Sequence, residues 1–420
     1  MRLLPLLALA ALAADVRAAG AEAKTRDAIA KVWVDYGTWL AGQGQKVEAE
    51  RALAEAREAA AEAPGVAALA AAVEALAEER APALGLEDRR KKAHAEAAKL
   101  YERFAGIDHE KSEEARFSGY LLKAAELDPS KARLGKLFGL AKQAAGNKAN
   151  VDFAGRLLLR LRDIDPAGAA KGVYDPLERE MAQDDVAVLR GDGHACVGYL
   201  SLPDGWKGRG EWPVLVAVEG AGCGFLGAAR GFATSRGSRG YLVLTPCSLS
   251  NTNELDAAKY PFYDEATLEA GSADRIAFDL AGLEALLQVV KRRYGGGERI
   301  GITGFSGGGN LCYAWLALHS DRTLFAAPAC ANFTGMGLRD AAAIEGGGPP
   351  VHILTGEKDP HKDLTHGKFK PGIEEQTDAA VATLARLAFT NVRRTMLPGV
   401  GHASCAREVW AFADETAAKR

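Results

Sequence analysis

Two hydrophobic patterns divide the chain. Up to about Met181 the composition is rich in Ala, Glu, Lys, Arg and Leu, and apolar side chains recur at helical spacing, as in Ile29, Trp33 and Tyr36. That spacing places the apolar side chains on one face of a helix. From about Asp184 onward, short runs rich in Val, Ile and Leu alternate with longer helical patterns. Such an alternation predicts a mostly parallel sheet with helices on both faces.

The change of pattern predicts two folded domains. Residues 21–182 are expected to form an all-α domain, and residues 184–420 an α/β domain. Proline-containing breaks divide the first domain into helices. Its Asp128-Pro129 break and its Tyr36-Gly37 pair resemble those of tetratricopeptide repeats, while a plain helical bundle explains the same residues. This domain is expected either to bind a protein partner or to shield an edge of the second domain.

The first residues follow a third pattern. Met1-Arg2 is followed by an apolar run from Leu3 to Leu12, with small-residue sites at 11–13 and 16–18. The run is too short to span a bilayer as a helix, and a charged start before small residues is typical of a secretory signal. We expect residues 1–18 to be a cleaved signal peptide, with an uncleaved anchor as the alternative. The mature protein is then exported, to the periplasm or the medium, without stable membrane insertion.

Charge and cysteine content narrow the possible partners. The formal net charge is −3 and no sustained Lys/Arg patch is present, which argues against a nucleic-acid partner. No C-x-x-C pair or zinc-spaced His/Cys cluster occurs, so no metal is expected. An even number of cysteines permits disulfides in an exported chain, and Cys223 could pair with Cys247 or stay free. The cysteines all lie in the second half: Cys196, Cys223, Cys247, Cys312, Cys330 and Cys405.

One five-residue pattern points to chemistry. Gly304-Phe305-Ser306-Gly307-Gly308 follows a short Ile- and Thr-rich run, which predicts a buried strand, and precedes a helical run at 310–318. The pattern matches the Gly-x-Ser-x-Gly nucleophile elbow, in which the serine occupies a sharp strand-to-helix turn. Ser306 is therefore the candidate nucleophile. A glycine-rich turn that carries an inert serine is the alternative.

Two further loops provide the partners that a serine nucleophile needs. Asp359 and His402 each follow a predicted strand, and the carboxyl ends of parallel strands meet at one edge of a sheet. His402 is expected to take the hydroxyl proton of Ser306, while Asp359 holds the imidazole in the right tautomer. Glu357 lies on the same loop and is the alternative acid. The other histidines of this region are expected to pack in the core or to face solvent: His352, His361 and His366.

A glycine-rich loop at 219–224 follows another predicted strand. The backbone N–H groups of Ala221 and Gly307 are expected to form an oxyanion hole, because developing negative charge needs preorganised donors. Aromatic residues in the long insert at 248–271 would either line a substrate pocket or fill a satellite core. The tentative substrate-binding residues are Glu219, Gly222, Tyr260, Phe262 and Tyr263.

With Ser306, Asp359 and His402 in this chain order, residues 186–419 resemble the α/β-hydrolase superfamily. The elbow and the turn at 398–403 look most like those of secreted esterases, in the polyhydroxybutyrate-depolymerase and feruloyl-esterase branch, with dienelactone-hydrolase-like enzymes close by. The resemblance implies an α/β-hydrolase fold and a serine hydrolase that cleaves a small-molecule or polymer-derived carboxylic ester without a cofactor. Those relatives usually carry His-Gly where this chain has Glu219-Gly220.

Two other functions fit parts of the same pattern. A serine peptidase of the prolyl-oligopeptidase-like type would use the same three residues, but no β-propeller pattern precedes the α/β domain. A helical scaffold with a non-catalytic hydrolase domain is the second alternative, and Glu219 is the residue that suggests it. An ester hydrolase remains the leading prediction.

Overall fold

The computed structural model describes residues 4–110, 114–208, 210–338, 341–363 and 371–419, with the side chains of 4–18, 106–110 and 114–117 left out. The chain forms two compact units, one of Met1–Gln143 with Arg160–Lys171 and the other of Ala144–Leu159 with Gly172–Arg420. The composition had placed the boundary at residues 182–184. The second unit includes an earlier helical segment because that segment packs on its sheet: Asp152 accepts a hydrogen bond from Tyr199, at 2.7 Å.

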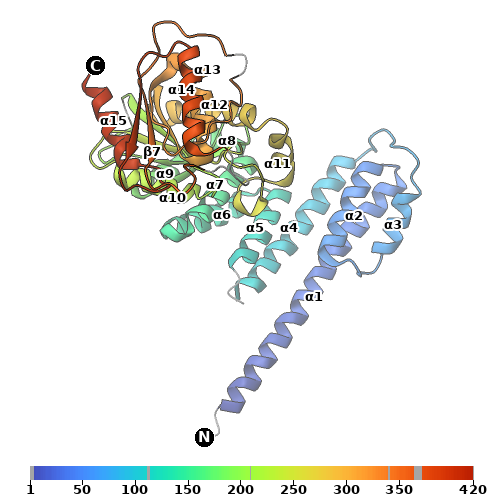
Figure 1. Cartoon of the computed structure of the whole chain (residues 1–420). Coiled ribbons are helices and arrows are strands. Elements are labelled where there is room, and N and C mark those ends of the chain that lie inside the picture. Colours follow the sequence, from blue (N-terminus) through green and yellow to red (C-terminus); the bar gives the residue numbers. More distant parts are fainter. Residues whose placement is uncertain (1–3, 111–113, 209, 339–340, 364–370, 420) are drawn as a thin grey trace. The chain divides into compact units, whose positions relative to one another are not determined.

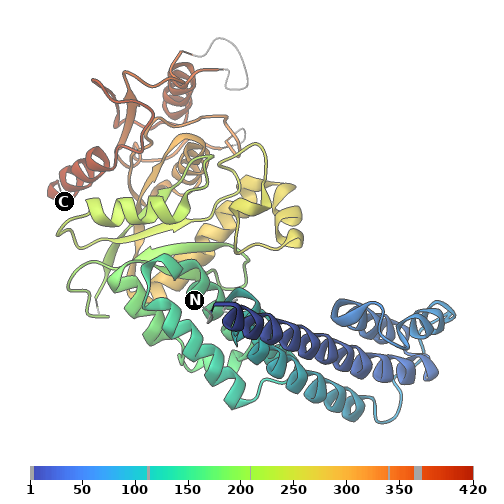
Figure 2. The same ribbon diagram turned by 90° about the horizontal axis from the view of Figure 1, so that it is seen from below.

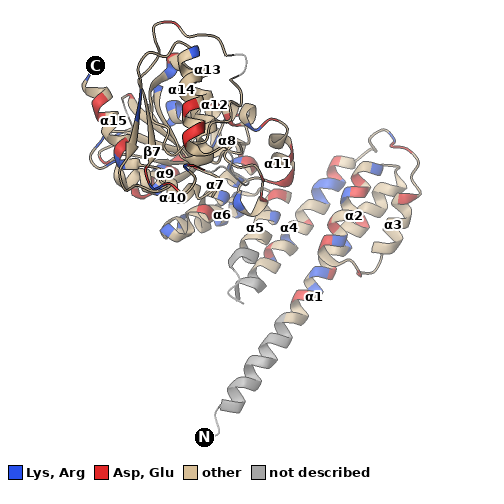
Figure 3. Cartoon of the chain, viewed as in Figure 1, with Lys and Arg blue, Asp and Glu red and all other residues tan. Residues whose placement is uncertain are grey.

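Helices are the regular elements among the described residues of the first unit. Its core combines large side chains with many alanines, which let helices approach closely: Trp33 and Leu40 are buried with Ala49, Ala52 and Leu69. Lys and Arg alternate with Asp and Glu along its surface (Figure 3). Its helices are α1 (Leu4–Gly42), α2 (Lys46–Ala60), α3 (Val66–Glu74), α4 (Leu86–Glu110), α5 (Glu114–Leu127), α6 (Lys131–Ala145) and α8 (Pro166–Ala170).

Two predictions about this half of the chain remain predictions. The signal-peptide prediction concerns residues 1–18, whose side chains lie outside the described part of the structure. The resemblance to tetratricopeptide repeats is not tested by the helix arrangement. Within the described residues, none of the helices combines the length and the apolar character that a membrane crossing requires.

The second unit contains an eight-stranded sheet in the order β1-β2-β4-β3-β5-β6-β7-β8. Strand β2 runs antiparallel to both of its neighbours, and all the other pairs are parallel. This order is that of the α/β-hydrolase fold, so the predicted fold class is confirmed. The strands are β1 (Ala187–Arg190), β2 (Val197–Ser201), β3 (Trp212–Val218), β4 (Leu242–Pro246), β5 (Gly296–Gly304), β6 (Thr323–Ala326), β7 (Val351–Gly356) and β8 (Val392–Leu397).

Helices cover both faces of this sheet (Figures 1 and 2). Leu215 and Ala217 of β3 point to one face, where they pack with Phe232 of α10 and Trp410 of α15. Val214, which alternates with them, faces α12 on the other side, as its contact beside Gly296 shows. The helices are α7 (Val151–Ile164), α9 (Asp175–Asp184), α10 (Phe225–Ser235), α11 (Glu265–Ser272), α12 (Arg275–Tyr294), α13 (Gly309–Leu318), α14 (Ile373–Arg386) and α15 (Ala406–Ala418).

Helix α12 leads directly into the strand that carries the elbow. Its N-cap is Asp274, whose carboxylate accepts the backbone N–H of Ala277, at 3.0 Å. It ends at Gly295, which adopts the left-handed conformation with φ +72°. Basic residues fill its last turn, where they complement the helix dipole. These local signals end the helix at the residue before β5 begins.

Packing of α12 on the sheet should be a major source of stability. Leu286 is fully buried and packs against the backbone of Gly198 in β2. We expect Leu286→Ala to lower the free energy of unfolding by about 2–5 kcal/mol, because it leaves a cavity in a packed layer. Gln288→Ala, two positions further on the exposed face, should change it by less than about 0.5 kcal/mol. Urea unfolding followed by tryptophan fluorescence measures both variants, and equal losses would contradict this packing.

Candidate active site

Ser306 occupies the predicted sharp turn between strand and helix. It follows β5 and opens a short 3₁₀ turn before α13, and its φ of +50° lies in the left-handed region. A non-glycine residue persists there only where its surroundings determine the backbone. Here the carbonyl of Ser306 accepts the N–H of Asn332, at 2.8 Å, and the N–H of Phe305 bonds to Val218, at 3.0 Å. The last residue of β3 and the loop after β6 therefore hold the elbow.

Two glycines let the loops of neighbouring strands reach the elbow. A Cβ atom on Gly307 would lie 1.8 Å from the carbonyl oxygen of Asn251, and one on Gly220 would lie 2.9 Å from Cβ of Ser306. Both positions therefore require glycine for steric reasons. The sequence pattern predicted glycine beside the serine, but the backbone of Asn251 that imposes it comes from the insert after β4.

A cavity of about 430 Å³ opens over Ser306. The residues predicted as nucleophile, general base and oxyanion donors all contribute to its wall: Ser306, His402, Ala221 and Gly307. Its volume lies in the range of small-molecule sites. The other lining residues are mostly uncharged and able to form hydrogen bonds: Ser250, Asn251, Thr252, Asn253, Asn310, Asn332, Phe333, Thr334, His361, Pro371, Ile373 and Gln376.

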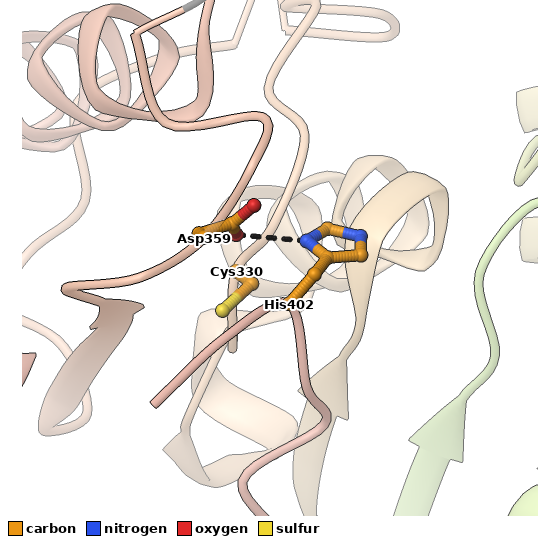
Figure 4. Close-up of side chains that lie close together, drawn as sticks. All are labelled: Cys330, Asp359 and His402. Atoms are coloured by element: carbon orange, nitrogen blue, oxygen red, sulfur yellow. Dashed lines mark hydrogen bonds and ion pairs between the residues drawn. The ribbon is translucent and has the colours of Figure 1, made fainter. Parts of the chain in front are cut away.

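Asp359 and His402 form a hydrogen-bonded pair (Figure 4). Nδ1 of His402 lies 2.8 Å from Oδ2 of Asp359, and the side chain of Asp359 is 1% exposed. Its second oxygen, Oδ1, accepts the backbone N–H of His361, also at 2.8 Å. Glu357, the alternative acid, is exposed and accepts the N–H of Gly399 instead. The carboxylate next to the imidazole is therefore that of Asp359.

The hydroxyl group of Ser306 points toward Asn332. Its Oγ lies 3.5 Å from Oδ1 of Asn332, and among the described residues no hydrogen bond joins it to His402. Such bonds are often long in unliganded sites and form when substrate binds. Phe305 packs on the imidazole of His402, with ring centroids 4.7 Å apart. Asn332 was missed from the sequence because nothing marks a single Asn in a loop as a site residue.

His361 also lies closer to the site than the sequence suggested. It was expected to face solvent, yet it is half-buried, lines the cavity and packs edge-on against His402, with ring centroids 4.8 Å apart. His366 lies outside the described residues. His352 is buried, as expected, and its Nε2 lies 2.9 Å from the hydroxyl of Thr395.

A buried thiol adjoins the Asp359–His402 pair. Sγ of Cys330, a carboxylate oxygen of Asp359 and a ring nitrogen of His402 all lie within 4.8 Å of one another. Burial opposes the charged imidazolium of His402, but its hydrogen bonds to Cys330 and Asp359 outweigh burial and raise its pKa above the ordinary value. No sequence pattern pointed to Cys330.

The same three groups are of the types that bind zinc. However, Nδ1 of His402 and Oδ2 of Asp359 already bond to each other, so an ion between them would have to replace that hydrogen bond. The arrangement fits a hydrogen-bonded pair with a neighbouring thiol better than a metal centre.

The tentative substrate-binding residues do not line the cavity. Tyr260 is buried, and its hydroxyl lies within hydrogen-bonding distance of Ser248 and Asn251. Tyr263 is also buried and donates to the carbonyl of Cys247, at 2.7 Å. These two tyrosines therefore fill a satellite core and do not form a wall of the substrate pocket. Their hydroxyl groups bond to the carbonyls of Ser248 and Cys247, two residues that do not line the cavity.

The other three tentative substrate-binding residues, Phe262, Gly222 and Glu219, also lie outside the cavity wall. The ring of Phe262 packs on Tyr199 at 5.9 Å. Gly222 is exposed in its loop. Glu219 is half-buried at the end of β3, and burial raises its pKa, although the backbone N–H of Gly220 opposes this shift. Glu219 is therefore not part of the cavity wall.

Asn251, which also lines the cavity, supports the predicted oxyanion loop through a hydrogen bond. Its Nδ2 donates to the carbonyl of Gly220, at 2.8 Å, and its Oδ1 lies 3.2 Å from the hydroxyl of Tyr260. Asp279 of α12 holds the preceding residues in turn, because its buried carboxylate accepts the N–H groups of Leu249 and Ser250. Sequence patterns within single elements did not reveal this support.

All six cysteines are free buried thiols. The possible disulfide between Cys223 and Cys247 is therefore not formed. Cys223 instead lies within hydrogen-bonding distance of the carbonyl of Ala221 and the hydroxyl of Tyr260, both at 3.5 Å.

The chain was compared with known proteins. Neither a scan against protein-family models nor a search of curated proteins found a match. Among solved structures it is similar to poly(aspartic acid) hydrolase-1 from Sphingomonas sp. KT-1, with 20% identity and a TM-score of 0.38 over 54% of this chain and 97% of that protein. Esterase 2 of Thermogutta terrifontis matches with 16% identity and a TM-score of 0.38, over 56% of this chain and 93% of that one. A thermostable esterase matches with 18% identity and a TM-score of 0.37, over 57% of this chain and 63% of that one.

The contacts of His402 predict its titration. In the wild-type protein, NMR of the ring carbons should give His402 a pKa above 6.5, whereas His352, buried beside Arg393, should titrate near 4. Asp359→Asn and Cys330→Ala should each lower the pKa of His402, because each removes a group that favours the imidazolium. His352 is the internal control and should not move. A wild-type pKa of 6.5 or below for His402 would show that burial prevails and that these contacts are wrong.

The buried carboxylate of Asp279 predicts a pH dependence of stability. Burial raises its pKa from 3.8 to about 6, so between pH 4 and 6 the folded state binds more protons than the unfolded state. The stability present below pH 4 is therefore lost as the pH rises toward 6, by up to about 3 kcal/mol. Asp279→Asn should remove this decline, while Glu269→Gln, which replaces an exposed carboxylate on α11, should retain it. Urea unfolding at several pH values measures the decline, and a slope that Asp279→Asn leaves unchanged would contradict it.

Proposed function

We propose that the chain is an exported serine hydrolase that cleaves a carboxylic ester through an acyl-enzyme on Ser306. One observation carries the proposal: Ser306, the imidazole of His402 bonded to buried Asp359, and the backbone of Ala221 and Gly307 meet at one cavity. If the glycine-rich turn carried an inert serine, the presence of a buried Asp–His pair at the same cavity would have no explanation. Export rests on the pattern of residues 1–18.

In this mechanism His402 acts as general base. Nε2 takes the proton of Ser306 as Oγ attacks the ester carbonyl, while the bond from Nδ1 to Asp359 fixes the tautomer and stabilises the imidazolium. The N–H groups of Ala221 and Gly307 donate to the developing oxyanion. Collapse of the tetrahedral intermediate releases the alcohol, which takes the proton from His402. Water then attacks the acyl-enzyme by the same route and regenerates Ser306.

Two features support a small, neutral or weakly polar substrate. The cavity holds about 430 Å³, and the side chains on its described wall are mostly uncharged amides, hydroxyls and apolar groups. We therefore propose a small-molecule or polymer-derived ester as substrate. The helical unit is proposed to bind a protein partner. Along its described residues, Lys and Arg are interspersed with Asp and Glu (Figure 3), which does not favour nucleic acid as that partner.

The nucleophile is tested by active-site labelling. A fluorophosphonate should add once to the folded wild-type protein, as seen by intact mass, and not to Ser306→Ala. Turnover of a short-chain p-nitrophenyl ester should fall by at least about a thousandfold in Ser306→Ala and by about ten-thousandfold in Asp359→Asn, which leaves the wrong tautomer. Ser320→Ala, after α13 and outside the cavity wall, is the matched control.

The outcomes separate the alternatives. A labelled protein that cleaves p-nitroanilides faster than esters would replace the esterase by a peptidase. A well-folded protein without an adduct would end the enzyme proposal and favour a binding function for the whole chain. Loss of the adduct in Ser320→Ala as well would mean that the labelling reports folding rather than the nucleophile.

A further inference from the structure

Two buried cysteines lie on either side of the turn that carries His402. Sγ of Cys330, in the loop after β6, lies 3.7 Å from the carbonyl oxygen of Gly401. Sγ of Cys405, at the start of α15, lies 3.4 Å from the carbonyl oxygen of Ala403. The two thiols therefore bond to the carbonyls immediately before and after His402. The two thiols also lie near enough for each to shift the pKa of the other.

The backbone holds both cysteines in unusual conformations. Cys330 has a φ of +43° and Cys405 a φ of +49°, a region that non-glycine residues adopt only where their surroundings impose it. The N–H of Cys330 bonds to the carbonyl of Leu354 in β7, at 2.8 Å. Cys405 packs in the core with Val409 and Trp410. Each thiol is thus held in place by the sheet or by the helix behind it.

We propose that Cys330 and Cys405 are a redox site, and that their oxidation to a disulfide locks the His402 turn onto the loop that braces Ser306. That loop already holds the elbow, because Ala329 accepts the N–H of Ser306 and Asn332 donates to its carbonyl. A bond from Cys330 to Cys405 therefore links the support of the serine to the support of the histidine. The two cysteines are about 75 positions apart in the chain, a separation over which a cross-link restricts the unfolded state strongly.

The reaction is thiol–disulfide exchange with a small external disulfide such as oxidised glutathione. The thiolate of Cys330 attacks one sulfur of the external disulfide, forms a mixed disulfide and releases one thiolate. Cys405 then loses its proton, and its sulfur attacks Sγ of Cys330, forms the protein disulfide and releases the second thiolate. The two protein thiols lose two electrons, and one external disulfide is reduced to two thiols.

The local contacts favour this order of steps. When Cys330 ionises, it gives up its bond to the carbonyl of Gly401, and the S–H of Cys405 turns from Ala403 to donate to the thiolate. This bond lowers the pKa of Cys330 to about 5, against the effect of burial, and the bond to His402 acts in the same direction. Cys330 thus provides the thiolate and Cys405 retains its proton. Both residues are buried, so exchange requires a transient opening of the 401–405 turn and should be slow, on the order of minutes to hours.

Oxidation should also change His402, a consequence that rests on the proposed function. The groups that face His402 are Asp359, Cys330 and the ring of His361. Glu408 does not face His402, but its negative charge helps to raise the pKa of Cys405. The disulfide removes the negative sulfur of Cys330 but leaves Asp359 in place. His402 then loses its proton at a lower pH, so the acid limb of the ester-hydrolysis pH profile should move to lower pH on oxidation.

The site is tested on the full chain equilibrated in glutathione buffers from fully reduced to fully oxidised. After quenching with N-ethylmaleimide, the oxidised wild-type protein should carry two fewer alkyl groups than the reduced one. Trypsin should release residues 323–339 joined to residues 395–407. Cys405→Ser should lose this linkage, and Cys196→Ala, which removes a buried thiol immediately before β2, should keep it. The midpoint of thermal unfolding should rise on oxidation by at least about 5 °C in wild type and Cys196→Ala only.

The outcomes distinguish this proposal from the proposed function. Full alkylation of all six cysteines in the oxidised buffer, or a linkage between other cysteines, would overturn the redox site. A Cys330–Cys405 linkage without ester turnover would leave the site standing and overturn only the hydrolase. A linkage that raises the unfolding midpoint but does not move the pH profile would overturn the effect on His402.

Discussion

The site depends on the steric constraint at the nucleophile elbow. Ser306 adopts a left-handed conformation at the end of β5, and Gly307 has room for no Cβ because the carbonyl of Asn251 occupies the space. This close approach brings the insert after β4 against the loop of Gly220 and the start of α13. The cavity, the predicted oxyanion donors and the serine therefore take their positions from one backbone contact.

The two buried carboxylates near this contact, Asp359 and Asp279, have different hydrogen-bond partners and different roles. Asp359 is buried but has two hydrogen-bond donors, the ring of His402 and the backbone of His361, so its negative charge is satisfied. Asp279 accepts backbone N–H groups and has a raised pKa because burial dominates. The first carboxylate orients a side chain that can accept a proton from Ser306. The second supports the loop of Asn251, and its charge is a cost to folding above about pH 6.

The sequence pattern predicted the alternation of strands and helices because each strand and helix is encoded by a local period. The Ile- and Thr-rich run before the elbow is the end of β5, and the helical run predicted at 310–318 is α13, which begins one residue earlier. The fold class followed from these periods and from the chain order of Ser306, Asp359 and His402. The boundary between the compact units differs from the boundary that the composition predicted. The reason is that part of a helix with ordinary helical composition packs on β1 and β2.

By itself the sequence determined which strands and helices form, where the elbow lies and which loops follow parallel strands, since these depend on residues close together in the chain. Only the tertiary structure decided that Asp359 rather than Glu357 meets His402, that Tyr260 and Tyr263 fill a core, and that Cys330 adjoins the imidazole. Side-chain contacts between loops depend on the order and register of distant strands. That order arises from packing the whole sheet, and no local period encodes it.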